Sequence, residues 1–343
     1  MTYTYASSYI SGFGKPIEAI LKRHIKDVII VKHFDGLIIY KTKQEFSALR
    51  MPWFNNTYQV LAMAATDIKI PYETAVKKFM TKNEPNFAGI SDNLNATKNK
   101  SFKILPFDSN SPTSIDFNII KPLETKIKTN LKIKNEFRKH DLDIILSRRR
   151  EGCFLLLLKL TYTRLTEKNL PNGALRPELC NILAQISDIK PTDIILDPFC
   201  GHGSIPKEIQ KNLKYNMLFA SDQDETLVAN LKNEFKKNKK NLFIKQRDAL
   251  NLSYFQNGFF DEIITDPPWN AYNSKDEDFS IFYGKMLTEF HRILKPNGVC
   301  TVLMGNVTDF EKALKSVNFK ILEKYHILVN GKKANVYKLV KDV

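Results

Sequence analysis

Two short segments in the carboxyl-terminal half of the chain combine a carboxylate with residues that form tight turns. The first covers residues 197–204, with the sequence DPFCGHGS, and the second covers residues 266–269, with the sequence DPPW. Each follows a run of apolar residues typical of a buried strand. Glycines between a strand and a helix let the backbone approach a ligand closely. The two segments therefore predict ligand-binding loops at the ends of two strands.

The first loop has the composition of a site for a carboxylate-bearing cofactor. Asp197 ends the strand, Gly201 and Gly203 allow the turn, and we expect Ser204 to cap the helix that follows. The exposed amide groups at a helix start favour negative charge. A dinucleotide-binding loop would carry a third glycine where this chain has Pro206, so the loop favours a different cofactor.

Further aspartates follow at successive strand ends. Asp222 lies where a carboxylate can bridge ribose hydroxyls, and Asp248 where one can accept a hydrogen bond from an adenine amino group. Asp224 is a neighbouring candidate for the ribose role, or else a helix cap. A single such aspartate is more often a cap or turn residue, but three in succession favour a nucleoside site. The predicted cofactor-binding residues are Asp197, Phe199, Gly201, Gly203, Asp222, Asp248 and Ala249.

The second loop has groups that suit the binding of an exocyclic amine. An exocyclic amine is a poor nucleophile because its lone pair is delocalised into the ring. A carboxylate at Asp266 and the Pro267 carbonyl would accept its two N–H bonds and orient the lone pair. Trp269 would stack on the base; the alternative is a proline turn with a core tryptophan. The predicted catalytic residues are Asp266, Pro267, Pro268 and Trp269.

From about residue 181 the sequence alternates strand and helix patterns, which predicts a doubly wound α/β sheet with ligands at the strand carboxyl ends. The expected strands are 193–198, 217–222, 241–247, 261–266 and 298–304, with helices at 204–212, 224–238, 279–293 and 308–316. A closing antiparallel pair is expected at 319–328 and 334–340, turning at Asn330-Gly331.

The amino-terminal half reads as an α+β region. The expected elements are a helix at 16–24, strands at 28–31, 37–40 and 102–105, a long loop or mobile insert at 83–100, a basic helix at 122–131, and a hairpin of 142–146 with 153–158. The turn of that hairpin contains Arg148, Arg149 and Arg150, which we expect to be exposed and to bind RNA together with Lys126. Arg176 would reach the cofactor or an RNA phosphate, or else be a surface residue at a helix start.

Charge divides the chain in the same way. The 343 residues suggest two domains, 1–165 and 166–343. The first has 27 Lys and Arg against 15 Asp and Glu, and the second has 25 against 22. Biased coding would explain the total excess of lysine but not this asymmetry. A basic module that binds a polyanion, joined to a catalytic one, fits both observations.

Several classes are disfavoured. The four cysteines form no CxxC pair, which argues against a zinc site and a disulfide framework and favours a reducing compartment such as the cytoplasm. The histidines show no metal spacing, and His202 is not expected to be catalytic. No signal peptide is expected, and the longest apolar run, 154–158, is far below the ~20 residues of a membrane span.

With these motifs in order, the chain resembles the THUMP-domain RNA methyltransferases, the group that forms N2-methylguanosine in tRNA. The resemblance rests on the segments 175–179 (LRPEL), 195–204 and 266–269, with Asp222 and Asp248 between them. The amino-terminal order is similar to a ferredoxin-like subdomain followed by THUMP. The resemblance implies S-adenosylmethionine as cofactor, tRNA as partner, and a Rossmann-like methyltransferase sheet preceded by an RNA-binding region.

Other functions stay open at this point. The tryptophan at position 269 also resembles adenine-N6 methyltransferases, so adenine-N6 or cytosine-N4 methylation of a nucleic acid is an alternative, as is guanine-N2 methylation of rRNA. An RNA-binding module with a vestigial fold is a different class, and the intact aspartates and glycines speak against it. No sequence feature predicts a partner protein or an oligomeric state.

Overall fold

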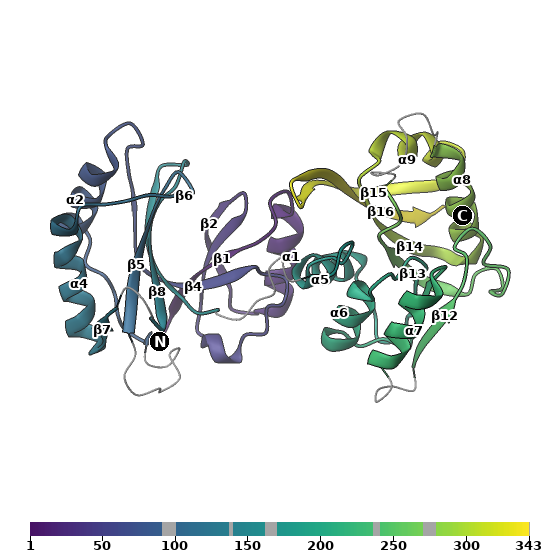
Figure 1. Ribbon diagram of the computed structural model, residues 1–343, viewed down its shortest axis with the longest axis horizontal. Helices are drawn as coiled ribbons and strands as arrows, with labels where there is room; N and C mark the ends of the chain where they lie inside the picture. Colours follow the sequence, from purple (N-terminus) through teal and green to yellow (C-terminus); the bar gives the residue numbers. More distant parts are fainter. Residues whose placement is uncertain (91–100, 137–139, 162–169, 236–240, 270–278, 343) are drawn as a thin grey trace. The chain divides into compact units, whose positions relative to one another are not determined.

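A computed structural model describes residues 1–90, 101–136, 140–161, 170–235, 241–269 and 279–342 (Figure 1). The chain forms two compact units. Unit 1 contains Met1–Tyr9 and Leu21–Arg164, and unit 2 contains Ile10–Ile20 and Leu165–Val343. Each unit is described by itself below.

Unit 1 contains one mixed sheet to which nine described strands contribute. Its order is β2-β3-β1-β4-β9-β8-β5-β6, and β7 pairs with β5. The strands are β1 (Tyr3–Ser8), β2 (Ile29–Phe34), β3 (Leu37–Thr42), β4 (Asn56–Ala65), β5 (Ser101–Asp108), β6 (Ser111–Pro112), β7 (Lys134–Asn135), β8 (Leu142–Arg148) and β9 (Cys153–Lys159). The helical segments are α1 (Gly14–His24), whose first part belongs to unit 2, η1 (Phe46–Ala48), α2 (Tyr72–Lys82) and α4 (Phe117–Leu131).

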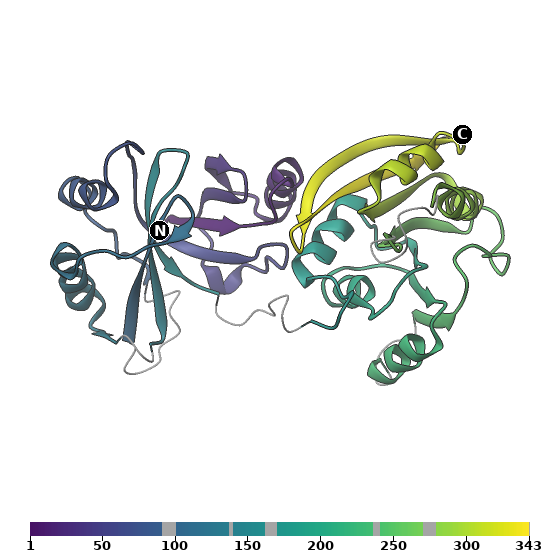
Figure 2. The same cartoon turned by 45° about the horizontal axis from the view of Figure 1, so that its top comes forward.

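The strongest apolar run of the chain occupies the middle of this sheet. Strand β9 pairs with both β4 and β8, and its residues are almost all buried, because its side chains pack on both faces of the sheet. Phe154 packs against Phe79 of α2, and Leu155 packs in a cluster with Ile39 of β3. The two predicted hairpins, β2–β3 and β8–β9, are confirmed. Strands β1 and β4 and helix α2 were not predicted. Helices α2 and α4 lie side by side in both views (Figures 1 and 2).

Helix α4 begins earlier than the sequence predicted. Asp116 is its N-cap, and the Asp116 side chain accepts a hydrogen bond from the backbone N–H of Asn118 at 2.7 Å. Pro122, the expected first residue, lies inside the helix. The cap supplies the start signal that the position of the proline obscured. Most of the expected loop at 83–100, namely 91–100, lies outside the described residues.

Unit 2 has the doubly wound arrangement that the sequence predicted. Its sheet order is β12-β11-β10-β13-β14-β16-β15; the first five strands are parallel, and β16 is antiparallel to β14 and β15. The strands are β10 (Ile194–Asp197), β11 (Met217–Asp222), β12 (Leu242–Gln246), β13 (Phe260–Thr265), β14 (Leu294–Met304), β15 (Phe319–Val329) and β16 (Lys332–Lys341). The helices are α5 (Pro177–Ser187), α6 (Ser204–Asn212), α7 (Glu225–Glu234), α8 (Ser280–Ile293) and α9 (Val307–Leu314).

Helices cover both faces of this sheet. Helices α8 and α9 contribute Phe290 and Phe310 to a core with Phe219 of β11. Helix α7 contributes Leu231 to a second cluster with Ala220, the next residue of β11. Because successive strand residues point to opposite faces, α7 lies on the face opposite α8 and α9. The strand order reverses between β10 and β13, which places a ligand crevice at their carboxyl ends.

The described helices include none that is both long and apolar enough to cross a membrane. All four cysteines are free and buried.

Candidate active site

A cavity of about 240 Å³ lies where the carboxyl ends of β10, β11 and β13 meet. Asp197, Asp222 and Asp266, which are far apart in sequence, all line it. The structure thus brings together three of the predicted strand-end carboxylates. The other predicted residues among its lining are Phe199, Gly201 and Pro268.

Asp197 is 1% exposed at the end of β10. Its Oδ1 accepts hydrogen bonds from the Thr265 hydroxyl at 2.9 Å and the Phe199 backbone N–H at 3.3 Å. Burial raises the pKa of Asp197 to about 8, the two hydrogen bonds oppose that rise, and the nearby charges of Asp266 and Asp222 add to it. The carboxyl is therefore held rigidly between β10 and β13, and near-neutral pH changes its protonation.

Asp222 ties the glycine loop to the end of β11. Its Oδ2 accepts the backbone N–H of Gly201 at 2.9 Å, and its Oδ1 accepts that of Asp224 at 3.0 Å. Asp224 is the N-cap of α7, with its side chain accepting from Thr226 and Leu227, so of its two predicted roles the cap is observed. Of Asp222 and Asp224, only Asp222 is among the residues that line the cavity.

Gly203 occupies a position that strongly favours glycine. Its φ is +74°, and a Cβ there would lie 2.3 Å from Leu231 Cδ1. Gly203, not Ser204, is the N-cap of α6, so the predicted serine cap is wrong. The Ser204 hydroxyl instead accepts the backbone N–H of Leu175 at 3.2 Å, which fixes the segment before α5 against the loop.

Trp269 holds the carboxyl of the second loop. Its indole Nε1 donates to Asp266 Oδ1 at 2.8 Å. Its ring lies against the backbone of Gly305, where a Cβ would come within 2.1 Å of Trp269 Cε3. Burial raises the pKa of Asp266 to about 7, and the hydrogen bond from the indole opposes that rise. In this conformation Trp269 positions Asp266; its predicted stacking on a base stays a prediction.

The proline pair is fixed from helix α8. The hydroxyl of Tyr283, a fully buried residue, donates to the Pro268 carbonyl at 2.7 Å, while Pro267 is buried. Phe282, the preceding residue, lies 6.1 Å from the Phe199 ring, measured between ring centroids. Helix α8 therefore supports both loops of the site.

Asp248 and Ala249 lie outside this cavity. Asp248 is exposed beyond the end of β12, where its Oδ1 accepts the backbone N–H of Leu250 at 2.9 Å in a turn. Ala249 is buried. Strand β12 is the neighbour of β11, so these residues follow the adjacent strand end. Their contact with an adenine stays a prediction.

The expectation that Arg148 is exposed is wrong. Arg148 ends β8 and is 5% exposed. Its Nε and Nη2 donate to the two carboxylate oxygens of Asp108, each at 2.7 Å, and its Nη1 donates to the Ile70 carbonyl at 2.6 Å. The guanidinium also lies over the Tyr72 ring at 5.6 Å. A planar group with a bidentate partner and an aromatic support is a structural anchor.

The other predicted RNA-binding residues are less enclosed. Arg149 pairs with Glu151 at 2.9 Å, and Arg150 is exposed with its Nε donating to the Ser109 carbonyl at 3.1 Å. Lys126 is partly exposed and pairs with Glu84 at 2.6 Å. Arg176 is the N-cap of α5, with its Nε 3.5 Å from Glu178 Oε2.

Sequence reasoning missed several residues that build the cavity. Gly173, Leu175 and Gln223 line it, and Thr265 and Tyr283 hold its loops. Thr265 directly precedes Asp266, and Gly173 lies in a Pro-Asn-Gly turn before α5, which were usable signals. Tyr283 carried no such signal, because a tyrosine in an amphipathic helix is usually interpreted as a core residue.

Comparison with known families identifies this domain. Residues 164–335, half of the chain, match the family described as RMKL-like, methyltransferase domain. The chain belongs to this family. The match contains both predicted loops and the strands that carry them.

Relatives with curated names are modestly similar. A tRNA (guanine(10)-N2)-dimethyltransferase of Methanocaldococcus jannaschii is 28% identical over 193 residues, covering 50% of this chain and 51% of the relative. A tRNA (guanine(6)-N(2))-methyltransferase, THUMP3, of Mus musculus is 26% identical over 234 residues, covering 62% and 46%. The chain thus spans about half the length of the curated relatives it matches.

Among solved structures, TrmN from Thermus thermophilus has a TM-score of 0.77 and 17% identity, covering 99% of this chain and 100% of TrmN. A putative methyltransferase, SMU.472, complexed with SAH has a TM-score of 0.72 and 13% identity, covering 98% and 97%. At these identities the similarity establishes the fold, which extends over both units.

Proposed function

We propose that the protein is an S-adenosylmethionine-dependent methyltransferase that acts on the exocyclic N2 amine of a guanosine in tRNA. The observation that carries the proposal is the convergence of Asp197, Asp222 and Asp266 on one cavity in a methyltransferase-family domain. The names of the curated relatives supply the substrate class.

The cavity has features that suit the proposed cofactor. A Cβ at Gly201 would meet no described atom within 4 Å, so the backbone lies open to a ligand. Each of the two Asp222 oxygens accepts a separate backbone N–H, which orients the carboxylate. Each oxygen keeps a further lone pair for a ribose hydroxyl. The start of α6 offers backbone amides to the cofactor's carboxylate. Asp248 and Ala249 are proposed to contact its adenine.

When bound, S-adenosylmethionine supplies an electrophilic methyl group. Asp266 and the Pro267 carbonyl accept the two N–H bonds of the target amine and orient its lone pair. Because Trp269 holds Oδ1, Oδ2 remains for the amine. The new N–C bond would form as the methyl–sulfur bond of the cofactor breaks. The nitrogen then gives up a proton, and a carboxylate with a pKa of about 7 is suited to accept it.

The basic region 1–165 is proposed to position the RNA, as in the THUMP-domain group that the chain resembles. Its excess of Lys and Arg and the exposed Arg150 support this role. Arg149 and Lys126 are further candidates, whereas Arg148 is committed to Asp108. The free buried thiols suit a reducing compartment, and we propose the cytoplasm.

The test is to incubate the purified protein with labelled S-adenosylmethionine and separate pools of unmodified tRNA, rRNA and DNA. The methylated nucleoside is then identified by mass spectrometry, with Asp266→Ala as the control. N2-methylguanosine in tRNA is expected. N2-methylguanosine only in rRNA would mean that the substrate is rRNA. N6-methyladenosine or N4-methylcytosine would contradict the proposal that guanine is the target base. Cofactor binding without product in any pool would overturn the proposed activity.

A further inference from the structure

The indole ring of Trp269 lies directly against the backbone of Gly305. Strand β14 ends at Met304 and helix α9 begins at Val307, so Gly305 lies in the short connection between them. A Cβ at Gly305 would lie 2.1 Å from Trp269 Cε3, 2.4 Å from Cδ2 and 2.9 Å from Cγ. The optimal separation of non-bonded carbon atoms is about 3.5–4.0 Å. The indole ring therefore occupies the space that any larger residue at position 305 would fill.

Glycine at position 305 is explained by space and not by backbone conformation. The backbone of Gly305 lies outside the left-handed region that favours glycine. The connection is also held on both sides. Strand β14 pairs with β13 and β16, and the Asn306 side chain caps α9 by accepting the backbone N–H of Asp309 at 3.4 Å. We therefore expect a methyl group at position 305 to displace the indole ring and not the main chain.

The position of the ring determines the orientation of the Asp266 carboxyl. Trp269 Nε1 donates to Asp266 Oδ1 at 2.8 Å, while Asp266 Oδ2 stays available to a ligand. Pro268, which lies between the two residues, is fixed separately, because its carbonyl accepts the Tyr283 hydroxyl at 2.7 Å. Displacing the indole would thus release the carboxyl and leave the proline pair anchored.

We propose that Trp269 and Gly305 form a positioning pair for methyl transfer, in which the docked indole acts through its N–H to hold the Asp266 carboxyl for the target amine. Gly305 supplies the space that keeps the ring docked. The inference rests on the proposed function and deepens it, because it assigns the contribution of Trp269 to a hydrogen bond. A phenylalanine ring could also stack on a base but has no N–H to donate, so stacking and positioning make different predictions.

The protonation of Asp266 gives a readout of this hydrogen bond. Burial raises the pKa of Asp266 to about 7, and the indole N–H opposes that rise. The titratable groups that interact with Asp266 from other elements are Asp197 of β10, Cys180 of α5 and Tyr283 of α8. These three groups are neutral or negative, so they do not stabilise the carboxylate. Loss of the indole N–H should therefore raise the pKa of Asp266 further.

The test compares Trp269→Phe, Gly305→Ala and the double variant with wild type in the methylation of unmodified tRNA by the whole protein. Each single variant should lower kcat by about 10- to 100-fold and leave KM nearly unchanged, because orientation is lost while binding contacts stay. The inflection of kcat/KM near pH 7 should move to higher pH in both. The double variant should be no worse than Trp269→Phe, because Gly305 acts through the indole. A Trp269→Phe variant with the kcat of wild type would overturn the inference.

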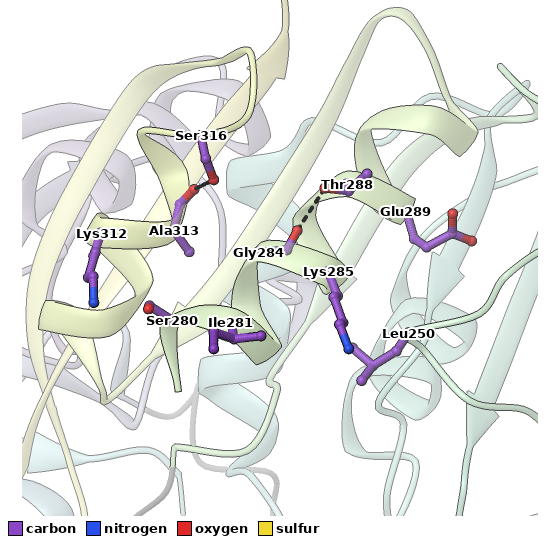
Figure 3. Close-up of a pocket in the computed structure, with 10 residues that line it drawn as sticks. All are labelled: Leu250, Ser280, Ile281, Gly284, Lys285, Thr288, Glu289, Lys312, Ala313 and Ser316. Atoms are coloured by element: carbon purple, nitrogen blue, oxygen red, sulfur yellow. Dashed lines mark hydrogen bonds between the residues drawn. The ribbon is translucent and has the colours of Figure 1, made fainter. Parts of the chain in front are cut away.

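Gly284→Ala is the matched control, because it also adds one methyl group at a glycine of unit 2. Gly284 lies in α8 beside a hollow between α8 and α9 (Figure 3). The described residues that line this hollow and those that line the candidate active site are different sets. A Cβ at Gly284 would meet no described heavy atom within 4 Å. Gly284→Ala should therefore keep the kcat and the pH profile of wild type.

Fluorescence tests the docking of the ring without any reaction. The chain has two tryptophans, and Trp53 of unit 1 is 1% exposed. The wild-type spectrum minus that of Trp269→Phe gives the emission of the docked Trp269. The spectrum of Gly305→Ala minus that of the double variant gives the emission of the displaced ring. Acrylamide should quench Trp269 more strongly in Gly305→Ala than in wild type. Equal quenching would show that the ring stays docked and would overturn the role of Gly305.

The two proposals fail in different ways. A wild-type protein that binds S-adenosylmethionine but methylates no RNA would overturn the proposed function, and this inference with it. A wild-type protein that methylates tRNA no faster than the two single variants would overturn this inference alone. An inflection that stays near pH 7 in both variants would also overturn it, because the Asp266 carboxyl would then not depend on the indole.

Discussion

Buried charge serves opposite purposes in the two units. In unit 1, Arg148 and Asp108 form a bidentate ion pair; the pair holds the pKa of Asp108 below its usual range and that of Arg148 above it. In unit 2, burial raises the pKa of Asp197 to about 8 and that of Asp266 to about 7. An ionisable group whose charged form is stabilised by its partner stabilises the fold. A carboxyl pushed towards neutrality beside a cavity is a group prepared for chemistry.

The largest expected effect is at Asp266 of unit 2. Asp266→Ala removes the group that orients the target amine and should lower methyl transfer by about 10²- to 10⁴-fold. Cofactor and tRNA affinities should stay near wild type, because Asp222 and the basic region are intact. Single-turnover assays together with binding titrations measure both. Activity within a few-fold of wild type would show that Asp266 does not have the assigned role.

The ion pair in unit 1 should show the reverse pattern. Arg148→Ala leaves the partly exposed Asp108 carboxylate without its partner and should cost about 2–3 kcal/mol of folding free energy. Thermal unfolding should shift down by roughly 5–10 °C, while turnover at a temperature where the variant is folded stays unchanged. Arg150→Ala, at an exposed position two residues on, is the control with little expected shift. A stable Arg148 variant would remove the distinction drawn between the units.

Another carboxyl of unit 2, which is buried, sharpens the comparison through pH. Glu262 of β13 accepts a hydrogen bond from Ser187, and burial raises its pKa to about 8 from 4.5. Because the folded state holds this proton more tightly, its stabilisation is present below about pH 4.5 and is lost as pH rises through about 8. Glu262→Gln keeps the neutral form at every pH. Its melting temperature should match wild type at pH 5 and exceed it by several degrees at pH 9. Parallel melting curves across that range would contradict the assignment.

The smallest expected effect concerns RNA. Arg150→Ala should lower the salt slope of tRNA binding by about 0.7–0.9, the contribution of one phosphate contact. Arg148→Ala should leave the slope unchanged, because its guanidinium is already bound to Asp108. Anisotropy titrations at several salt concentrations measure both. Equal losses in the two variants would mean that Arg148 reaches RNA after all.

The sequence predicted unit 2 more completely than unit 1, for physical reasons. Parallel strands ending in Asp197 and Asp222 carry local signals, since an apolar run, an acidic end and a glycine turn lie within a few residues of each other. Pairing in unit 1 is long-range: β1 joins β3 and β4, and no short motif encodes such contacts. The burial of Arg148 is of this kind, because Asp108 lies 40 residues earlier in the chain.

The candidate site, too, was predicted only in part. The groups that follow strand ends were found, whereas the supports that act across the fold were not. Thr265 on Asp197 and Tyr283 on Pro268 are hydrogen bonds between separate elements, and a single sequence gives no sign of such contacts. Asp248 was placed by analogy with the other strand ends, but its carboxylate closes a turn outside the cavity.

The most direct test of the central claim is the pH dependence of kcat/KM for methyl transfer, which reports groups of the free protein. The wild type should gain activity as Asp266 ionises, with an inflection near pH 7 and a plateau above it. Asp266→Asn keeps an acceptor oxygen but cannot titrate, so its profile should be lower and lack that inflection. An inflection near pH 7 that persists in Asp266→Asn would contradict the assignment of Asp266 as the group that holds and deprotonates the amine.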